Sequence, residues 1–269
     1  MIRSFARAAL AGSLSLVLVV ADATGPSDAT AVAIMKAVAM RADSGRQQAR
    51  LRFTLTPKSG APQVRDATAY RAVESDVRRT SIVFVAPPAI RGSSFLAWDV
   101  QDPAMADDQW LYLPALRRAR RIPAHDRGAY FLGTDLTYED MRSMGRLASD
   151  DYRLEAPRPA AHDPALVEIE GTPLTDGLRK DLGYGRVRWT VDPKRSFVVR
   201  STHWDVQGAP LKTVTFESIE QVDSIWMAKT ITVDNQKTGH RTRLEFSDVT
   251  NRPSFDPALL TPAGLERGG

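Results

Sequence analysis

The stretch that decides the fold is residues 107–141, DDQWLYLPALRRARRIPAHDRGAYFLGTDLTYEDM. It begins with the aromatic run 110–113, which is typical of a β-strand. It continues through a basic segment and ends in a helix start, because Thr137 and Asp140 have the spacing of a capping box. The sequence therefore predicts a strand, a charged edge and a short helix in succession.

The basic segment of this stretch contains four arginines, Arg117, Arg118, Arg120 and Arg121. Such a run fits a nucleic-acid patch, a contact with lipid headgroups or a protein partner, or a charged strand edge that prevents edge-to-edge aggregation. The amino terminus argues against nucleic acid. The headgroup or partner contact and the protective edge both stay open.

The amino terminus has the three parts of a secretory signal peptide. Arg3 and Arg7 precede an apolar region at 8–20, and the small residues 21–23 follow. The apolar region is shorter than the ~20 residues that a helix needs to cross a bilayer. We therefore expect residues 1–23 to be removed on export and residues 24–269 to form one periplasmic domain.

Composition narrows the chemistry. The chain has 269 residues, no cysteine, a formal net charge of +4 and a pI near 9.5. Without cysteine there can be no disulfide, thiol nucleophile or lipid-bearing cysteine. A basic exported chain of this length is suited to anionic headgroups or an acidic protein face.

Periodicity predicts a mostly β protein of the α+β class. Residues 28–44 read as a helix that is apolar on more than one side, and from residue 48 onward the period changes to two. A polar, proline-rich segment at 153–163 reads as a loop. The expected strands are a hairpin from residue 48 to 73, then 79–86, 94–100, 109–113, 187–191, 197–206, 211–219, 225–233 and 242–249.

Catalytic and metal-binding signals are weak. The histidines stand apart in sequence, without a zinc or serine-hydrolase motif, at His125, His162, His203 and His240. Asp135, Glu139 and Asp140 form an acidic cluster, for which helix capping is favoured over a metal or acid–base site. We expect no cofactor, no metal and no catalytic residue.

Several short motifs recur in a characteristic order. They are 86–88 (APP), 95–98 (FLAW), 110–114 (WLYLP), 188–189 (RW), 204–205 (WD), 226–227 (WM) and 237–239 (KTG). In this order the chain resembles the LolA-like outer membrane lipoprotein-sorting protein family, the periplasmic lipoprotein carrier superfamily. The resemblance implies a half-open antiparallel β-barrel of about eleven strands, with helices covering an apolar cavity.

That resemblance also implies a function: a periplasmic carrier, without enzymatic activity, that shields acyl chains of lipoproteins or lipids for transfer toward the outer membrane. Its partners would be an inner-membrane transporter or an outer-membrane acceptor, and we expect a monomer. The alternative is an envelope interaction module working with a membrane transporter complex. From strand alternation we expect the cavity to be lined by Ile34, Val38, Leu51, Phe53, Leu55, Phe84, Trp98, Leu111, Leu113 and Met141.

One departure concerns the lid. In the best-studied carriers an arginine directly precedes the proline after the strand that corresponds to residues 79–86, and it latches the lid. Here that place is occupied by Ala86, before Pro87. The cargo is therefore left open between lipoprotein and membrane lipid.

Overall fold

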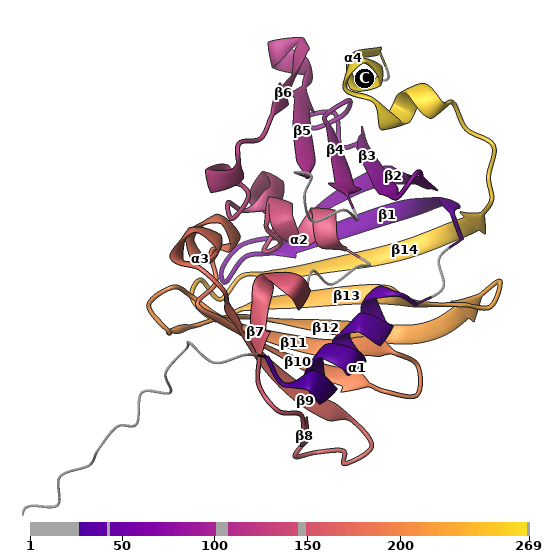
Figure 1. The fold of residues 1–269 in the computed structure, drawn as a ribbon. Helices are drawn as coiled ribbons and strands as arrows, with labels where there is room; N and C mark the ends of the chain where they lie inside the picture. The colour runs from indigo at the N-terminus through magenta and orange to yellow at the C-terminus, as the bar shows by residue number, and fades with distance from the viewer. Residues whose placement is uncertain (1–26, 42–43, 101–106, 145–148, 268–269) are drawn as a thin grey trace, which may run out of the picture.

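The computed structural model describes residues 27–41, 44–100, 107–144 and 149–267. The expected signal peptide lies outside this part of the chain. The described residues form one antiparallel sheet of fourteen strands that does not close, since its order runs β6-β5-β4-β3-β2-β1-β14-β13-β12-β11-β10-β9-β7, with β8 beside β9 (Figure 1). The mostly β, half-open architecture is confirmed.

The strands are β1 (Arg46–Thr56), β2 (Gln63–Glu74), β3 (Val77–Ala86), β4 (Ser94–Val100), β5 (Asp108–Leu113), β6 (Arg118–Arg121), β7 (Tyr152–Leu154), β8 (Arg158–Pro159), β9 (Val167–Pro173), β10 (Arg186–Asp192), β11 (Phe197–Trp204), β12 (Pro210–Val222), β13 (Ile225–Asn235) and β14 (Arg241–Asn251). The helices and 3-10 turns are α1 (Ala29–Ala39), η1 (Pro114–Leu116), η2 (Ala124–Asp126), η3 (Phe131–Gly133), α2 (Tyr138–Ser143), η4 (Ser149–Asp151), α3 (Asp176–Leu182), η5 (Pro257–Leu260) and α4 (Pro262–Arg267). None of the described helices has the length and hydropathy of a membrane span.

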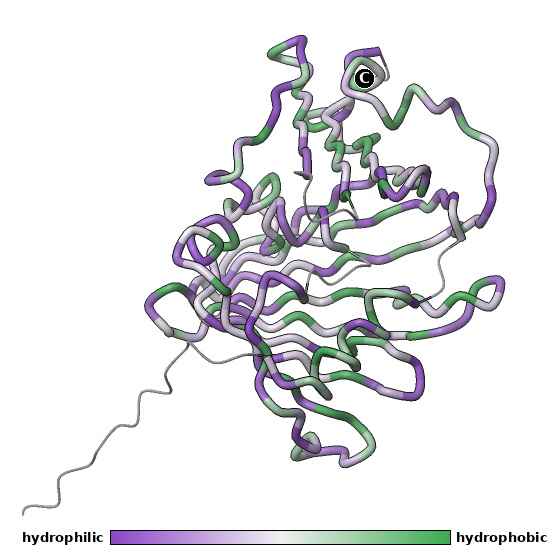
Figure 2. The backbone as a smooth tube through the Cα atoms, viewed as in Figure 1, coloured by the Kyte–Doolittle hydropathy of each residue, from purple (hydrophilic) through white to green (hydrophobic). Residues whose placement is uncertain are grey.

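Hydrophobic and hydrophilic residues follow one another along the strands, as the colours of Figure 2 show. Because successive residues of a strand point to opposite sides, the sheet has two chemically different faces. In β1, Leu51 and Phe53 are buried while Arg50 and Arg52 are exposed. Phe53 stands opposite Leu244 of β14. The apolar residues therefore gather on one side, which we call the inner face.

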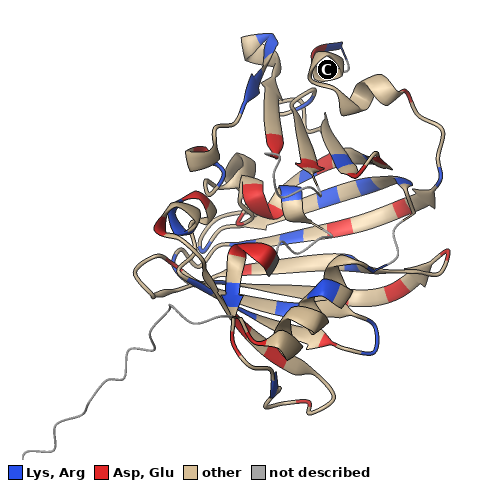
Figure 3. Cartoon of the chain, viewed as in Figure 1, with Lys and Arg blue, Asp and Glu red and all other residues tan. Residues whose placement is uncertain are grey.

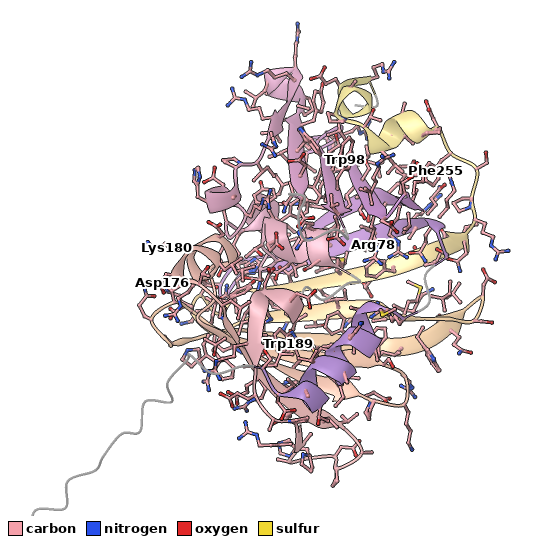
Figure 4. All side chains as sticks on the ribbon, in the orientation of Figure 1. Arg78, Trp98, Asp176, Lys180, Trp189 and Phe255 are labelled. Atoms are coloured by element: carbon pink, nitrogen blue, oxygen red, sulfur yellow. The ribbon has the colours of Figure 1, made fainter. Side chains whose placement is uncertain are left out.

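Helices α1 and α2 lie across this inner face (Figure 1). Asp28 caps α1 by accepting from the backbone N–H groups of Thr30 (2.9 Å) and Ala31 (3.0 Å). The buried side of α1 includes Met35 and Val38, which pack in a core cluster with side chains of β10, β11 and β12. In Figure 4, Trp189 of that cluster lies beside α1.

Helix α2 covers a second core cluster. Met141 packs there with Phe53, Phe95 and Phe131. The predicted capping box is confirmed, because Asp140 N–H donates to Thr137 Oγ1 at 3.0 Å and Thr137 N–H donates to Asp140 Oδ2 at 2.6 Å. The helix is therefore fixed at its first turn, directly above the sheet.

The carboxyl-terminal segment covers the opposite face of β4 and β5. Leu265 of α4 packs with Leu96 and Tyr112. Trp98 stacks edge-on against Trp110 with ring centroids 4.9 Å apart, and its indole N–H donates to the Leu260 carbonyl oxygen at 3.0 Å (Figure 4). This end of the sheet is thus covered on both sides.

Two local features differ from expectation. The segment expected to be a loop at 153–163 contains the short strands β7 and β8, which both pair with β9. A helix, α3, was not anticipated. It begins because Thr175 Oγ1 accepts from Leu178 N–H at 3.1 Å, and it ends because Gly183 has φ 76°, the left-handed conformation that glycine adopts readily.

Candidate ligand cavity and its lid

Two adjoining cavities lie between the helices and the inner face. The first, of about 150 Å³, is bordered by α2 and by strands β10, β11 and β12. The second, of about 120 Å³, is bordered by β1, β2, β3, β13 and β14. Both are lined by the same five residues at their junction: Arg41, Met144, Phe197, Phe216 and Ile231.

The walls of both cavities are mainly apolar. Val187, Trp189, Val198 and Val214 line the first, and Leu51, Ile82, Ala228 and Phe246 line the second. Such walls favour hydrocarbon over water, since apolar surface gains free energy when it leaves water.

Trp189 is held in the wall of the first cavity by a glycine beneath it. A Cβ atom added at Gly171 of β9 would lie 2.5 Å from the Trp189 ring. Trp189 also stacks edge-on with Tyr152 at 5.1 Å between centroids. The missing side chain at Gly171 therefore sets how deeply the tryptophan sits.

The ten residues proposed for the cavity wall fall into distinct places. Leu51 and Met141 line the second cavity. Ile34 and Val38 of α1 pack in the core cluster beside the first cavity. Phe53, Leu55, Phe84 and Leu111 belong to the core cluster under α2 and line neither cavity, and Leu113 is half-buried at the end of β5.

Trp98 lies on the outer side of the sheet. In β4, Phe95 and Ala97 belong to the inner cluster, whereas Leu96 and Trp98 belong to the cluster under α4. Successive residues of a strand point to opposite faces, so an error of one residue in the strand pattern moves a side chain to the other face. The expectation that Trp98 lines the cavity is therefore wrong.

The arginine segment forms the edge of the sheet. Strand β6 pairs only with β5 in the sheet order, and the ribbon at this tip carries the blue of Lys and Arg positions in Figure 3. Arg117, Arg118 and Arg120 are exposed. Arg121 is also exposed, and its guanidinium donates to the Asp108 carboxylate.

A buried lysine fastens the beginning of α2 to the sheet. Lys212 of β12 is fully buried, and its Nζ donates to the Asp135 carbonyl oxygen at 2.9 Å and to the Asp140 carboxylate. The Tyr184 hydroxyl donates to the same carboxylate at 2.8 Å. Burial alone would raise the pKa of Asp140, but Lys212, His203 and the hydrogen bonds outweigh it and lower that pKa.

A buried arginine fastens the far side of α2. Arg142 pairs with Glu139 on its own helix, with Asp99 of β4 and with Asp107, whose Oδ2 lies 3.0 Å from Nη1. Burial acts against the charge, yet the three carboxylates raise the pKa of the Arg142 guanidinium above its ordinary value. Arg78, labelled in Figure 4, reaches the same Asp99 at 3.7 Å.

A third contact stands near the place of the missing latch arginine. Ala86 of β3 is opposite Asp66 of β2, and the residue next to Asp66 is Arg65. The Arg65 guanidinium donates to the Leu132 carbonyl oxygen in η3, six residues before α2 begins at Tyr138. An arginine on the neighbouring strand thus holds the lid segment.

Further polar side chains converge around the lid. His240 Nδ1 lies 2.5 Å from Asp135 Oδ2, to which Thr242 Oγ1 also donates at 2.7 Å. Within the described chain, no group of three His, Cys, Asp or Glu side chains is placed to hold a metal ion. In the acidic cluster, Asp135 accepts from Thr242 and Asp140 accepts from Lys212, both on strands of the sheet, while Glu139 pairs with Arg142.

Sequence reasoning did not identify one pair in the first cavity. Ser201 Oγ lies 2.9 Å from His203 Nε2, and both side chains are buried on the inner face of β11. Burial, then the positive charge of Lys212, lowers the pKa of His203 to about 3, so the imidazole is neutral. The sequence does contain a signal for this pair. Residues alternate along β11, and Ser201 and His203 share one face, whereas Arg200 before them and Thr202 between them are less buried.

This pair resembles part of a serine-hydrolase triad. In a triad the second ring nitrogen of the histidine is held by a carboxylate. Among the described residues, His203 Nδ1 is buried and has no hydrogen-bond partner. The pair therefore lines the cavity without the carboxylate that would orient the histidine of a triad.

Comparisons with known proteins fit this geometry. A family model described as an uncharacterized protein matches residues 76–267. A domain assigned to the outer membrane lipoprotein-sorting proteins, from Vibrio parahaemolyticus, superposes with a TM-score of 0.77 at 25% identity, covering 88% of this chain and 99% of that one. A DUF1329 family protein from Desulfovibrio piger gives a TM-score of 0.75 at 22% identity, covering 87% and 95%.

The chain belongs to the LolA-like DUF1329 family. A LolA superfamily protein from Nitrosomonas europaea has the same fold, with a TM-score of 0.62 at 16% identity over 86% of this chain and 97% of that one. Among curated proteins, none matches. The resemblance drawn from the tryptophan-containing motifs is confirmed, and the LolA-like fold accounts for helices that cover one face of an open sheet.

Proposed function

We propose that this LolA-like protein is a periplasmic carrier that shields the acyl chains of lipoproteins or lipids and transfers them toward the outer membrane. The observation that carries the proposal is the pair of adjoining, mainly apolar cavities between α2 and the inner face. The similarity to a lipoprotein-sorting domain supports it. In this proposal residues 1–23 are a signal peptide and residues 24–269 are the carrier.

The hydrophobic effect supplies the driving force. Each methylene that leaves water contributes roughly 0.8 kcal/mol, so ten methylenes contribute about 8 kcal/mol. Such a gain corresponds to a micromolar dissociation constant before the costs of association are subtracted. No covalent step is needed to carry the chain.

Loading requires the lid to move. Ligand pockets usually have volumes of about 300–1,000 Å³, and the two cavities have about 150 and 120 Å³. Met144, which follows α2, lies in the wall that they share, so a displacement of α2 would join them. A ligand favours the joined form only by binding it more tightly than the closed form.

The first test is mass spectrometry of an organic extract from the mature protein, purified from periplasm without detergent. A stoichiometric lipid or acylated peptide supports the carrier and names its cargo. A clean extract, together with no binding of a fluorescent acyl probe by the delipidated protein, refutes it.

A variant sharpens this test. Met144→Trp fills the junction of the cavities, so we expect weaker binding of the acyl probe. Met40→Trp is the matched control, because Met40 lies at the end of α1 and is 72% exposed. Equal probe binding by both variants would argue against the junction as the ligand site.

The exposed arginine edge supports a second candidate, an envelope interaction module that binds a membrane transporter complex. Replacing Arg117, Arg118 and Arg120 with serine should abolish capture of that complex and leave acyl-probe binding intact. Under the carrier proposal alone, capture of the complex and binding of the acyl probe both depend on the cavity. Arg121, which is paired with Asp108, serves as the single-site control.

A further inference from the structure

We infer that Ser201 and His203 form a head-group site, which hydrogen-bonds an uncharged, oxygen-bearing group at the end of the acyl ligand in the first cavity. The inference rests on the proposed carrier function and specifies which class of head group the cavity accepts. An ester carbonyl or a glyceride hydroxyl has the required chemistry.

The pair lies in the wall of the cavity that we propose for the ligand. Ser201 and His203 both line the first cavity, and they stand two residues apart on one face of β11. In the sheet, Ser201 is opposite Trp189 and Val214, while His203 is opposite Val187. Two polar side chains therefore interrupt the part of the wall that β10, β11 and β12 form, which is otherwise apolar.

The histidine has an unused hydrogen-bonding atom. Its Nε2 lies 2.9 Å from Ser201 Oγ, and its buried Nδ1 has no partner in the described part of the chain. If the serine donates to Nε2, then Nδ1–H is a donor without an acceptor. In the other tautomer Nδ1 is an acceptor without a donor, so a hydroxyl satisfies either form and a carbonyl satisfies the first.

A buried polar atom without a partner is costly. Leaving one unsatisfied typically destabilises a protein by about 1–3 kcal/mol. A ligand that supplies the missing hydrogen bond recovers this free energy on binding, whereas a plain hydrocarbon does not. By the conversion of 1.4 kcal/mol per tenfold, the recovery corresponds to a preference of roughly 5- to 150-fold.

The charges around the pair favour an uncharged head. Lys212 is paired with Asp140, and Arg142 is paired with Glu139. Burial lowers the pKa of His203 to about 3, so the imidazole brings no positive charge to an anion. The cation at the junction, Arg41, lies 4.6 Å from the ring centroid of Phe197, which begins β11 six residues before His203.

The test compares ligands that share a twelve-carbon chain and differ in the head. Wild-type protein is titrated with 1-monolauroylglycerol, laurate and dodecyl phosphate in competition with a fluorescent acyl probe. We expect the uncharged glyceride to bind tightest. In His203→Phe its affinity should fall by roughly 5- to 150-fold, while binding of the probe and of dodecyl phosphate is retained.

Two further variants isolate the effect. Thr202→Val changes the neighbouring residue, which is less buried and lies on the other side of β11, and should leave the preference intact. Ser201→Ala keeps the imidazole and should reduce glyceride binding in the same direction. It also gives the readout if His203→Phe does not fold.

The outcomes separate this inference from the carrier proposal. A wild-type protein that binds the probe but prefers the anionic heads overturns the head-group site, as does a glyceride preference that survives in both His203→Phe and Ser201→Ala. Absence of any probe binding by the wild type overturns both ideas. If the preference is found, a synthetic diacylglyceryl-cysteine peptide is compared with free diglyceride, and the tighter ligand identifies lipoprotein or lipid as the source of the ester.

Discussion

The buried lysine on β12 offers the most direct test of how the lid is held. Lys212 is fully buried and donates to the Asp135 carbonyl oxygen and to the carboxylate of Asp140 in the first turn of α2. In Lys212→Met the apolar stem remains, but Asp140 loses its cation while 16% of its side chain is exposed. Removing one partner of a buried ion pair typically costs about 3–5 kcal/mol.

Urea denaturation of the mature protein at pH 7, followed by tryptophan fluorescence, measures this cost. The matched control is Lys229→Met, because Lys229 is 27% exposed and pairs with Glu220 at 3.5 Å on the surface. That pair should contribute less than about 1 kcal/mol. Adding Asp140→Asn to Lys212→Met should recover part of the loss, since the uncompensated charge is then removed. Equal stability losses in the two lysine variants would refute the assignment of Lys212 as the fastening of the lid.

Three other changes have defined outcomes. The pKa of His203 is lowered from 6.5 to about 3 in the folded protein. As the pH falls, the unfolded chain therefore takes up a proton before the folded protein does, and the free energy of unfolding should fall by about 2.5 kcal/mol between pH 7 and pH 4.5. Denaturation at a series of pH values should show a smaller fall in His203→Phe. Arg142→Met removes the buried cation shared by Glu139, Asp99 and Asp107 and should cost about 3–5 kcal/mol. The exposed Arg121→Met should cost less than about 1 kcal/mol in the same urea titration. Gly171→Ala forces a Cβ against Trp189 and should cost about 1–3 kcal/mol, with a changed tryptophan emission spectrum.

The long strands were predictable because their signal is local. Residues 211–219 and 242–249 alternate between apolar and polar, and they correspond to β12 and β14. The capping box of α2 was equally local, since both partners are three residues apart. A pattern that depends on neighbours in sequence can be read without knowing the fold.

Features that depend on distant partners could not be read in this way. Lys212 meets Asp140 from 72 residues away, and nothing in either segment specifies the other. Alternation did contain a partial signal, because Lys212 has the same parity as Val214 and Phe216. Helix α3 was missed for a different reason: it is seven residues long and has Gly177 in its first turn, so propensity argues against it.

Under the carrier proposal, three contacts of the lid segment would take the place of the arginine that is absent before Pro87. Arg65, Lys212 and Arg142 hold the segment from η3 to α2 at separate places, on β2, on β12 and within the carboxylates near β4. If the lid opened and all three contacts separated, water would reach the buried charges. Hydration would then lessen the loss of free energy from each broken contact. It would still remove short charge-assisted hydrogen bonds, which are the stronger kind.

Distributed fastening has a consequence for loading. A ligand shifts the lid only by its different affinity for the open and closed forms, and moving an equilibrium from 1:99 to 99:1 takes about 5.5 kcal/mol. Seven methylenes transferred from water supply roughly that amount at about 0.8 kcal/mol each. Short chains should therefore leave the lid closed, whereas chains longer than this have enough free energy both to separate α2 from the inner face and to remain bound. Under the carrier proposal, a lid held by several polar contacts over a mainly apolar cavity therefore selects long acyl chains over short ones, whichever head group they bear.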